Sequence, residues 1–365
     1  MSQAKILTVI GTRPQLIKAS LLSQAVRGEP KFRRRLVEVL VDTEQHYDER
    51  MAKRFFRELK IPRPDYALGV GSGSHAAQTA KMMERLERVM LKEKPSLVVV
   101  YGDTNSTLAG ALAAVKLNLP VAHIEAGLRS YDLAMPEEVN RILTDRVSRL
   151  LFCPTSNAVE NLKKEGVRAG VSIVGDLMVE LCQNRLGKIS ERKILSRFRA
   201  SPQAYFLATV HRAENTDDPK RLSRLLKALS RLDAPVLFPM HPRTRKRVRE
   251  FHLEGLLKRS KTIQILPPLG YEESLCLQKN ARKVLTDSGG VQKEAYILGT
   301  PCVTLRETTE WIETLRGGWN LLAGWDSNRM VALAKKPGRP TASRNGFGNG
   351  RPSLLILKGI AEFVG

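Results

Sequence analysis

The chain has 365 residues, of which 42% are hydrophobic and 27% are charged, and its formal net charge is +23. This length exceeds that of an ordinary single hydrophobic core, so we expect two domains, and the composition is that of a globular protein. No apolar run approaches the length of a membrane span, and residues 1–10 contain too short an apolar core for a signal peptide. These features predict a cytoplasmic protein with no membrane insertion.

The excess of Lys and Arg requires a nucleic-acid partner to be considered. Basic residues are densest at 31–35 and 243–249, but aromatic residues make up only 5% of the chain and are not interleaved with these clusters. Proteins that bind single strands use aromatic side chains to stack the bases. We therefore interpret the clusters as solvated surfaces and predict no nucleic-acid partner, although such a positive field would also attract an anionic small substrate.

Cysteine and histidine spacing gives no sign of a metal site. Cys153, Cys182, Cys276 and Cys302 are far apart and lie mostly in apolar segments, which indicates reduced thiols in the core. The six histidines lack the paired spacing of a metalloprotease helix. Neither a G-x-G-x-x-G fingerprint nor a P-loop lysine follows an early strand, so we predict no metal and no cofactor.

In the first half of the chain, short apolar runs typical of strands alternate with segments typical of helices. Such alternation predicts a parallel, doubly wound sheet. The predicted strands are residues 5–10, 97–101 and 121–124, and the predicted helices are residues 15–27, 75–92, 105–117, 137–149 and 157–165.

A second alternating series follows Ala200-Ser201-Pro202, so the fold class is α/β with two Rossmann-like domains. Its predicted strands are residues 205–210, 236–240, 262–266, 283–286 and 302–305. We predict an N-terminal domain at residues 1–175, a helical connection at 176–202, a C-terminal domain at 203–350 and a terminal helix at 351–365.

Polar residues follow several of the predicted strands, and the carboxyl ends of parallel strands face one ligand-binding crevice. Arg13 and Lys18 bracket the first turn and helix, where an anion can bind. Residues 287–290 (Asp-Ser-Gly-Gly) start another helix, and their backbone amides suit a diphosphate. Glu294, one turn further on, could accept hydrogen bonds from ribose hydroxyls. The alternative is an ordinary helix cap with glycines for the turn and a surface carboxylate.

Three carboxylates at strand ends or helix starts each have a structural alternative. Asp103 could cap the helix that begins near residue 105, Glu125 could simply end a strand, and Glu137 after Pro136 suits a first helical turn. Together with His211 they would face one crevice, where crowded carboxylates can act as acid and base near neutrality. We therefore prefer catalysis for the set.

At these positions the chain closely resembles the non-hydrolysing UDP-N-acetylglucosamine 2-epimerase family. This resemblance spans nearly the whole chain and implies a fold of the GT-B type, in which the two domains face a central cleft. The matching segments are GTRPQLIK (11–18), GDTNST (102–107), HIEAGLRS (123–130), MPEEVNR (135–141), TVHRAEN (209–215) and TDSGGVQKEA (286–295).

The resemblance implies that UDP-N-acetylglucosamine and UDP-N-acetylmannosamine are interconverted by elimination and re-addition of UDP, through a 2-acetamidoglucal and without metal or nicotinamide. It also implies a homodimer. The implied catalytic residues are Asp103, Glu125, Glu137 and His211. The implied substrate-binding residues are Arg13, Lys18, Leu269, Ser288, Gly289, Gly290 and Glu294, with His211 also on the diphosphate.

Several positions depart from the family pattern. Gln15 replaces the usual Glu, Ser274 replaces an aromatic residue near the uracil, and Trp311 replaces a ligand-binding Arg. Residues 43–46 read TEQH in place of TGQH, which puts a second, regulatory UDP-sugar site in doubt.

Two other functions stay open at this point. A 2-epimerase of a UDP-2,3-diacetamido-2,3-dideoxyuronic acid would share the core chemistry, with an extra basic contact to the uronate. A GT-B glycosyltransferase would share the fold and the grip on the nucleotide, but it would not need the three carboxylates.

Overall fold

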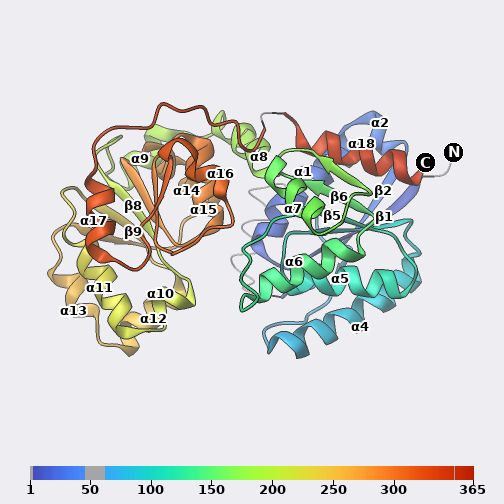
Figure 1. The fold of residues 1–365 in the computed structure, drawn as a ribbon, viewed down its shortest axis with the longest axis horizontal. Helices are drawn as coiled ribbons and strands as arrows, with labels where there is room; N and C mark the ends of the chain where they lie inside the picture. The colour runs from blue at the N-terminus through green and yellow to red at the C-terminus, as the bar shows by residue number, and fades with distance from the viewer. Residues whose placement is uncertain (1–2, 46–61, 349) are drawn as a thin grey trace. The chain divides into compact units, whose positions relative to one another are not determined.

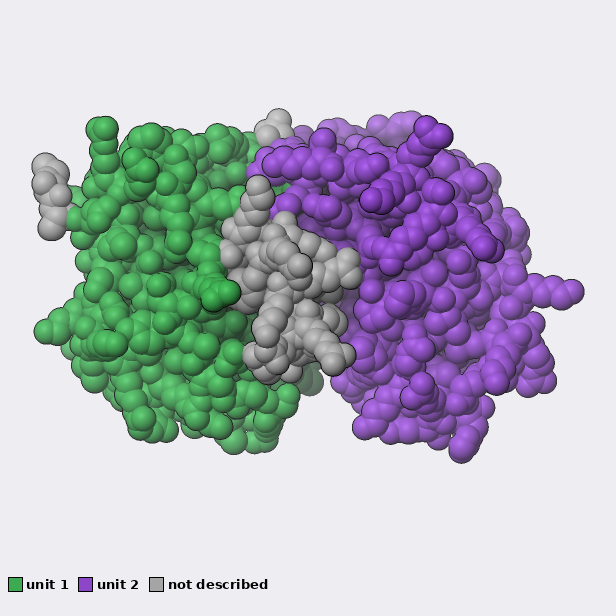
Figure 2. Space-filling model, turned by 180° about the vertical axis from the view of Figure 1, so that it is seen from behind, with its two compact units in different colours: residues 1–181, 347–365 green, residues 182–346 purple. Residues whose placement is uncertain are grey.

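The computed structural model describes residues 3–45, 62–348 and 350–365, and of Arg13 it describes only the backbone (Figure 1). The chain divides into two compact units, one of residues 1–181 with 347–365 and the other of residues 182–346 (Figure 2). Each unit is a parallel sheet covered by helices.

The sheet of the first unit has, within the described residues, seven parallel strands in the order β3-β2-β1-β4-β5-β6-β7. The strand order reverses between β1 and β4, and ligands bind beyond the carboxyl ends of the strands at such a point. All five residues of β4 are buried, as expected for a central strand covered on both faces. The strands are β1 (Ala4–Ile10), β2 (Leu36–Asp42), β3 (Tyr66–Ala67), β4 (Leu97–Tyr101), β5 (Val121–Ile124), β6 (Leu150–Cys153) and β7 (Val171–Ile173).

Helices of the first unit include the last helix of the chain, α18, which packs against α1. The Arg35 guanidinium donates to the Ala361 carbonyl (2.7 Å), and the Ser353 hydroxyl donates to Glu180 (2.7 Å). These bonds explain why residues 347–365 group with the first unit. The helices are α1 (Arg13–Gly28), α2 (Pro30–Arg33), α4 (His75–Glu93), α5 (Asn105–Lys116), α6 (Pro136–Val147), α7 (Ser156–Lys164), α8 (Leu177–Leu186, across the division) and α18 (Pro352–Val364).

The second unit contains a parallel sheet in the order β10-β9-β8-β11-β12-β13. Its strands are β8 (Phe206–Thr209), β9 (Val236–Pro239), β10 (Ile263–Leu266), β11 (Lys283–Thr286), β12 (Cys302–Thr304) and β13 (Asn320–Leu322). Its helices are α9 (Glu191–Arg197), α10 (Ala213–Thr216), α11 (Pro219–Leu229), α12 (Pro242–Glu250), α13 (Glu254–Arg259), α14 (Tyr271–Asn280), α15 (Gly289–Leu298), α16 (Ile312–Leu315) and α17 (Ser327–Lys335).

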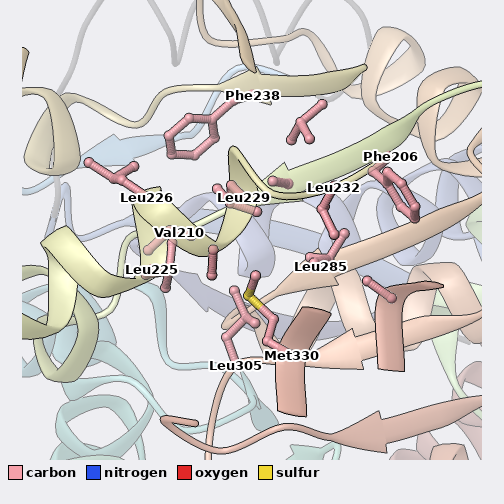
Figure 3. Close-up of a cluster of buried hydrophobic side chains, with 14 of the residues drawn as sticks. Phe206, Val210, Leu225, Leu226, Leu229, Leu232, Phe238, Leu285, Leu305 and Met330 are labelled. Atoms are coloured by element: carbon pink, nitrogen blue, oxygen red, sulfur yellow. The ribbon is translucent and has the colours of Figure 1, made fainter. Parts of the chain in front are cut away.

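A buried apolar cluster holds α11 against this sheet (Figure 3). Leu222, Leu225, Leu226 and Leu229 repeat at helical spacing, so one face of α11 is apolar and lies on the strands. Truncating such a leucine to alanine typically costs about 2–5 kcal/mol. The strands contribute Phe206, Phe238 and Leu285.

The two parallel sheets, each with its helices, confirm the predicted α/β fold class. None of the helices in the described part of the chain combines the length and apolar character that crossing a membrane requires.

Asp42, at the end of β2, carries a testable dependence of stability on pH. Its side chain is buried and accepts a hydrogen bond of 2.8 Å from the Glu44 N–H, and burial raises its pKa to about 6. The folded state therefore binds a proton that the unfolded chain releases at lower pH, so ionisation of Asp42 removes stability as the pH rises through this interval. A rise of about two pH units in the pKa corresponds to about 3 kcal/mol.

We expect Asp42→Asn, which cannot ionise, to gain about 3 kcal/mol relative to the wild type between about pH 4 and about pH 7. Urea unfolding of both proteins across this range measures the difference. A difference that stays constant with pH would show that Asp42 ionises equally well in the folded and unfolded states.

Candidate functional site

The turn after β4 presents Asp103 at the carboxyl end of the first sheet. Gly102 has a φ of 62°, which favours glycine, and the cap of α5 is Thr104, whose hydroxyl accepts from the Thr107 N–H. This corrects the structural alternative for Asp103, because the helix does not need its side chain as a cap. Instead, the Asp103 carboxylate pairs with the guanidinium of Arg141.

Glu125 follows β5 in a backbone conformation that is unusual for its residue type. Its φ is 73°, and its N–H donates to the Phe152 carbonyl (3.1 Å). The side chain, 10% exposed, pairs with Lys18, and its Oε2 would lie 3.2 Å from a Cβ placed on Gly102. Left-handed backbone at a residue other than glycine costs about 1–3 kcal/mol and is concentrated at functional sites. The Glu125 carboxylate therefore lies directly against the turn that carries Asp103.

Glu137 occupies the first turn of α6 after Pro136, as predicted, and borders a cavity of about 260 Å³ together with Asp103. Amides and an imidazole supply much of the remaining lining. The Asn105 amide donates to Gln78 (2.8 Å) and lies within hydrogen-bond distance of the His75 ring, and the Asn140 amide donates to the Asp103 carbonyl (2.9 Å). Among the lining residues that the structure describes there is no Lys or Arg.

A buried hydrogen-bond network holds the turn at Gly102 and Asp103. His123 is fully buried between the Asp145 carboxylate (2.7 Å from Nδ1) and the Gly102 carbonyl (2.7 Å from Nε2). Arg129 pairs with the other oxygen of Asp145 (2.7 Å). Although burial acts to raise the pKa of Asp145, the charges and hydrogen bonds of His123 and Arg129 hold it below its usual value. The network thus ties β5 and α6 to the turn before Asp103.

In the second unit, His211 follows β8 and is held by Asp287, which follows β11. The Asp287 carboxylate is fully buried and accepts from the backbone N–H groups of His211 (3.0 Å) and Arg212 (3.0 Å) and from the Asn215 amide (3.1 Å). Burial acts to raise the pKa of Asp287, but the His211 side chain, through its hydrogen bond and charge, and then the Asn215 amide and the Arg212 N–H hold it below its usual value. His241 lies beside His211, with 5.3 Å between the ring centroids.

The predicted diphosphate residues begin helix α15. Ser288 is the cap, its hydroxyl accepting from the Val291 N–H (3.4 Å), and Gly290 is exposed at the same end. A Cβ on Gly289 would collide with the Glu310 carboxylate and lie 3.0 Å from the Trp311 ring nitrogen, whereas one on Gly290 would meet only Ser288 Oγ at 3.9 Å. Of these two glycines, close packing therefore requires only Gly289. The space beside Gly290 and its backbone amide is open.

This difference predicts opposite effects of two neighbouring substitutions. Gly289→Ala should lower stability by about 1–3 kcal/mol through overpacking. Gly290→Ala should retain or raise stability, because alanine is the better helix former by about 0.5–1 kcal/mol, yet weaken UDP binding by crowding the amides. Thermal unfolding and UDP titration calorimetry measure both effects. Wild-type affinity in Gly290→Ala would place the diphosphate elsewhere.

Two further predicted ligand residues of the second unit, Glu294 and Leu269, lie around α14 and α15, as does Trp311, which departs from the family pattern. Glu294 is buried and accepts a hydrogen bond of 2.6 Å from Gln278, whose amide also donates to Ser274 (3.1 Å). Leu269 is half-buried beside the apolar cluster of this region. Trp311 is buried, with the Lys293 ammonium 3.8 Å from its ring centroid.

The structure thus places Asp103, Glu125, Glu137 and Lys18 near strand ends or helix starts of the first unit. His211, Leu269, Ser288, Gly289, Gly290 and Glu294 belong to the second unit. Arg13 begins α1, but its side chain lies outside the described part of the chain.

Sequence reasoning missed the partners that hold these groups, namely Arg141, Asn140, His75 and Asp287. Asn140 and Arg141 fall inside the quoted MPEEVNR segment, and Asp287 inside TDSGGVQKEA, which is the signal that could have drawn attention to them. Within the described residues, no group of three or more His, Cys, Asp or Glu side chains is placed to hold a metal ion.

The chain is similar to known proteins over nearly its whole length. The family model for UDP-N-acetylglucosamine 2-epimerase matches residues 29–361. A UDP-N-acetylglucosamine 2-epimerase homolog of Methanococcus maripaludis is 48% identical over 97% of this chain and 98% of its own length. The UDP-2,3-diacetamido-2,3-dideoxy-D-glucuronate 2-epimerase of Pseudomonas aeruginosa is 46% identical over 98% of this chain and 99% of its own length.

A solved structure is similar to this chain over almost the full length of both. The crystal structure of Methanocaldococcus jannaschii UDP-GlcNAc 2-epimerase in complex with UDP-GlcNAc and UDP matches with a TM-score of 0.89 and 43% identity, over 98% of this chain and 99% of that one. The match confirms the predicted two-domain α/β fold of the GT-B type.

Proposed function

Because the chain belongs to the UDP-N-acetylglucosamine 2-epimerase family, we propose that it interconverts UDP-N-acetylglucosamine and UDP-N-acetylmannosamine. The protein is a UDP-sugar 2-epimerase and hence an isomerase.

The residues that line the 260 Å³ cavity are the basis for proposing an N-acetylhexosamine as the sugar. Hydroxyl, amide and imidazole groups beside Asp103 and Glu137 suit a neutral N-acetylhexosamine, whose hydroxyls and acetamido group need donors and acceptors. A uronate would bring a third carboxylate toward Glu137 and toward Asp103, which is already paired with Arg141. No further Lys or Arg is among the lining residues that the structure describes. The lining therefore favours UDP-N-acetylglucosamine over the diacetamido uronate named for the Pseudomonas relative.

In the proposed mechanism, a carboxylate of the set Asp103, Glu125 and Glu137 takes the C2 proton while the C1–O bond breaks and UDP leaves. The product is a 2-acetamidoglucal. A second group of the set returns a proton to the opposite face of C2, and UDP adds again at C1. Two proton-transfer groups are required because removal and return occur on opposite faces.

UDP must be retained between the two halves of this reaction. We assign the diphosphate to Ser288, Gly289 and Gly290 at the start of α15, where backbone amides and the helix dipole attract an anion. Arg13, Lys18 and His211 are the proposed additional contacts. Glu294 is proposed for the ribose hydroxyls, and Leu269 for the uracil.

Proton NMR of the protein with UDP-N-acetylglucosamine in deuterated water tests this proposal. We expect UDP-N-acetylmannosamine with deuterium at C2, also in the presence of chelator and without added nicotinamide. Retention of the C2 proton would contradict the mechanism. Activity only on the diacetamido uronate would instead select the second substrate. The cytoplasmic location and the homodimer stay predictions.

A further inference from the structure

Asp287 and His211 form a dyad, of which the proposed mechanism uses only His211, as a contact of the diphosphate. Asp287 Oδ1 lies 3.2 Å from His211 Nδ1, while Oδ2 is occupied by the Arg212 N–H and the Asn215 amide. Both oxygens of the carboxylate accept from N–H groups, those of His211 and Arg212 and the Asn215 amide, so Asp287 acts as an acceptor. A neutral His211 ring must therefore carry its proton on Nδ1, which leaves the Nε2 lone pair on the other side of the ring.

The neighbouring histidine is fixed in the opposite way. His241 is the cap of α12, and its Nδ1 accepts from the Arg243 N–H (3.2 Å). A ring nitrogen that accepts carries no proton, so a neutral His241 has its hydrogen on Nε2. Two imidazoles with centroids 5.3 Å apart are thus held as opposite tautomers. The one bound to a carboxylate is the one prepared to accept a proton.

We propose that Asp287 is a positioning residue, which sets the tautomer and orientation of His211 so that Nε2 exchanges a proton with the leaving diphosphate. This inference rests on the proposed function. As the C1–O bond breaks, the protonated His211 gives its Nε2 proton to a β-phosphate oxygen of UDP, and it takes that proton back when UDP adds again. The Asp287 carboxylate stays ionised throughout and stabilises the imidazolium.

The groups that face His211 support this assignment. Asp287 is the carboxylate in contact with its ring, and His241 is the neighbouring imidazole. The adjacent Arg212 side chain is directed to Glu310, at 3.9 Å. Ser288, which follows Asp287 in the chain, caps the helix proposed to bind the diphosphate. The same segment would thus hold both His211, through Asp287, and the diphosphate.

The experiment compares Asp287→Asn with the wild type by long-range ¹H–¹⁵N NMR of the histidine rings at a pH where His211 is neutral. The wild type should show Nδ1–H, whereas the Asn amide would donate to Nδ1 and force the Nε2–H tautomer. Turnover of Asp287→Asn should fall by roughly two to four orders of magnitude with little change in KM, as for the same exchange in serine proteases. Asp217→Asn is the control, because it removes an aspartate whose carboxylate pairs with the Arg243 and Arg247 side chains. It should retain wild-type turnover and tautomer.

A double-mutant cycle separates positioning from a merely structural role. If Asp287 acts through His211, Asp287→Asn should not slow the His211→Gln variant further. A wild-type His211 with its proton on Nε2 would overturn the proposal, even if Asp287→Asn failed to fold. Turnover of Asp287→Asn within about twofold of the wild type would overturn it too. The NMR readout needs no substrate, so it stands apart from any failure to epimerise UDP-N-acetylglucosamine.

Discussion

Asp103→Asn and Glu137→Gln are each expected to slow epimerisation by roughly two to four orders of magnitude, the usual contribution of a general acid or base. Both side chains border the same cavity, and neither is needed for a helix cap, because Thr104 caps α5 and Pro136 begins α6. Asp103→Asn removes the ion pair with Arg141, whose side chain is only 6% exposed but keeps its pair with Glu138 at 3.2 Å. Because Glu138 still compensates the Arg141 charge, that loss should cost about 1–3 kcal/mol of stability.

Glu138→Gln is the matched control for Glu137→Gln. Glu138 is fully buried, accepts from the Ser130 N–H (2.8 Å) and the Tyr131 N–H (3.0 Å), and pairs with Arg141 (3.2 Å). Its replacement should therefore act mainly on stability, by about 1–3 kcal/mol, and slow turnover much less than Glu137→Gln. Single-turnover kinetics and thermal unfolding of the variants would separate the two effects. Near-normal turnover in both Asp103→Asn and Glu137→Gln would return these residues to structural roles.

Substitutions in the Lys18–Glu125 pair should separate the effect of Glu125 on turnover from its effect on stability. Both side chains are almost inaccessible, at 11% and 10% exposure. Glu125→Gln should lower turnover by roughly two to four orders of magnitude. It should also lower stability by up to about 3 kcal/mol, because the nearly buried Lys18 ammonium loses this carboxylate.

The double variant Lys18→Met/Glu125→Gln should regain most of that stability, because no uncompensated charge is left at this pair. Its turnover should stay as low as that of Glu125→Gln. Urea unfolding and deuterium exchange at C2 measure the two quantities on the same samples. Recovery of turnover in the double variant would mean that Glu125 serves only to neutralise Lys18.

The alternation of apolar runs with amphipathic segments was enough to predict two parallel α/β units. In a parallel sheet both faces are covered, so runs such as residues 97–101 must be continuously apolar, and this pattern is local. The same local pattern was enough to predict that Asp103 and Glu125 follow neighbouring strands and that Ser288 begins a helix. It did not identify the cap of α5, because Asp103 and Thr104 are both good capping residues and only the backbone geometry selects Thr104.

The sequence by itself therefore determined the layered architecture and the positions at which functional side chains emerge. Only the tertiary structure decided which of them meet. Asp103 meets Arg141, and Asp287 meets His211, across separations of 38 and 76 residues. Hydrophobic periodicity reports which face of an element is buried, but it carries no information on which side chains of different elements share a hydrogen bond. Such pairing depends on the strand order. Because β8 lies beside β11, Asp287 after β11 comes into contact with His211 after β8.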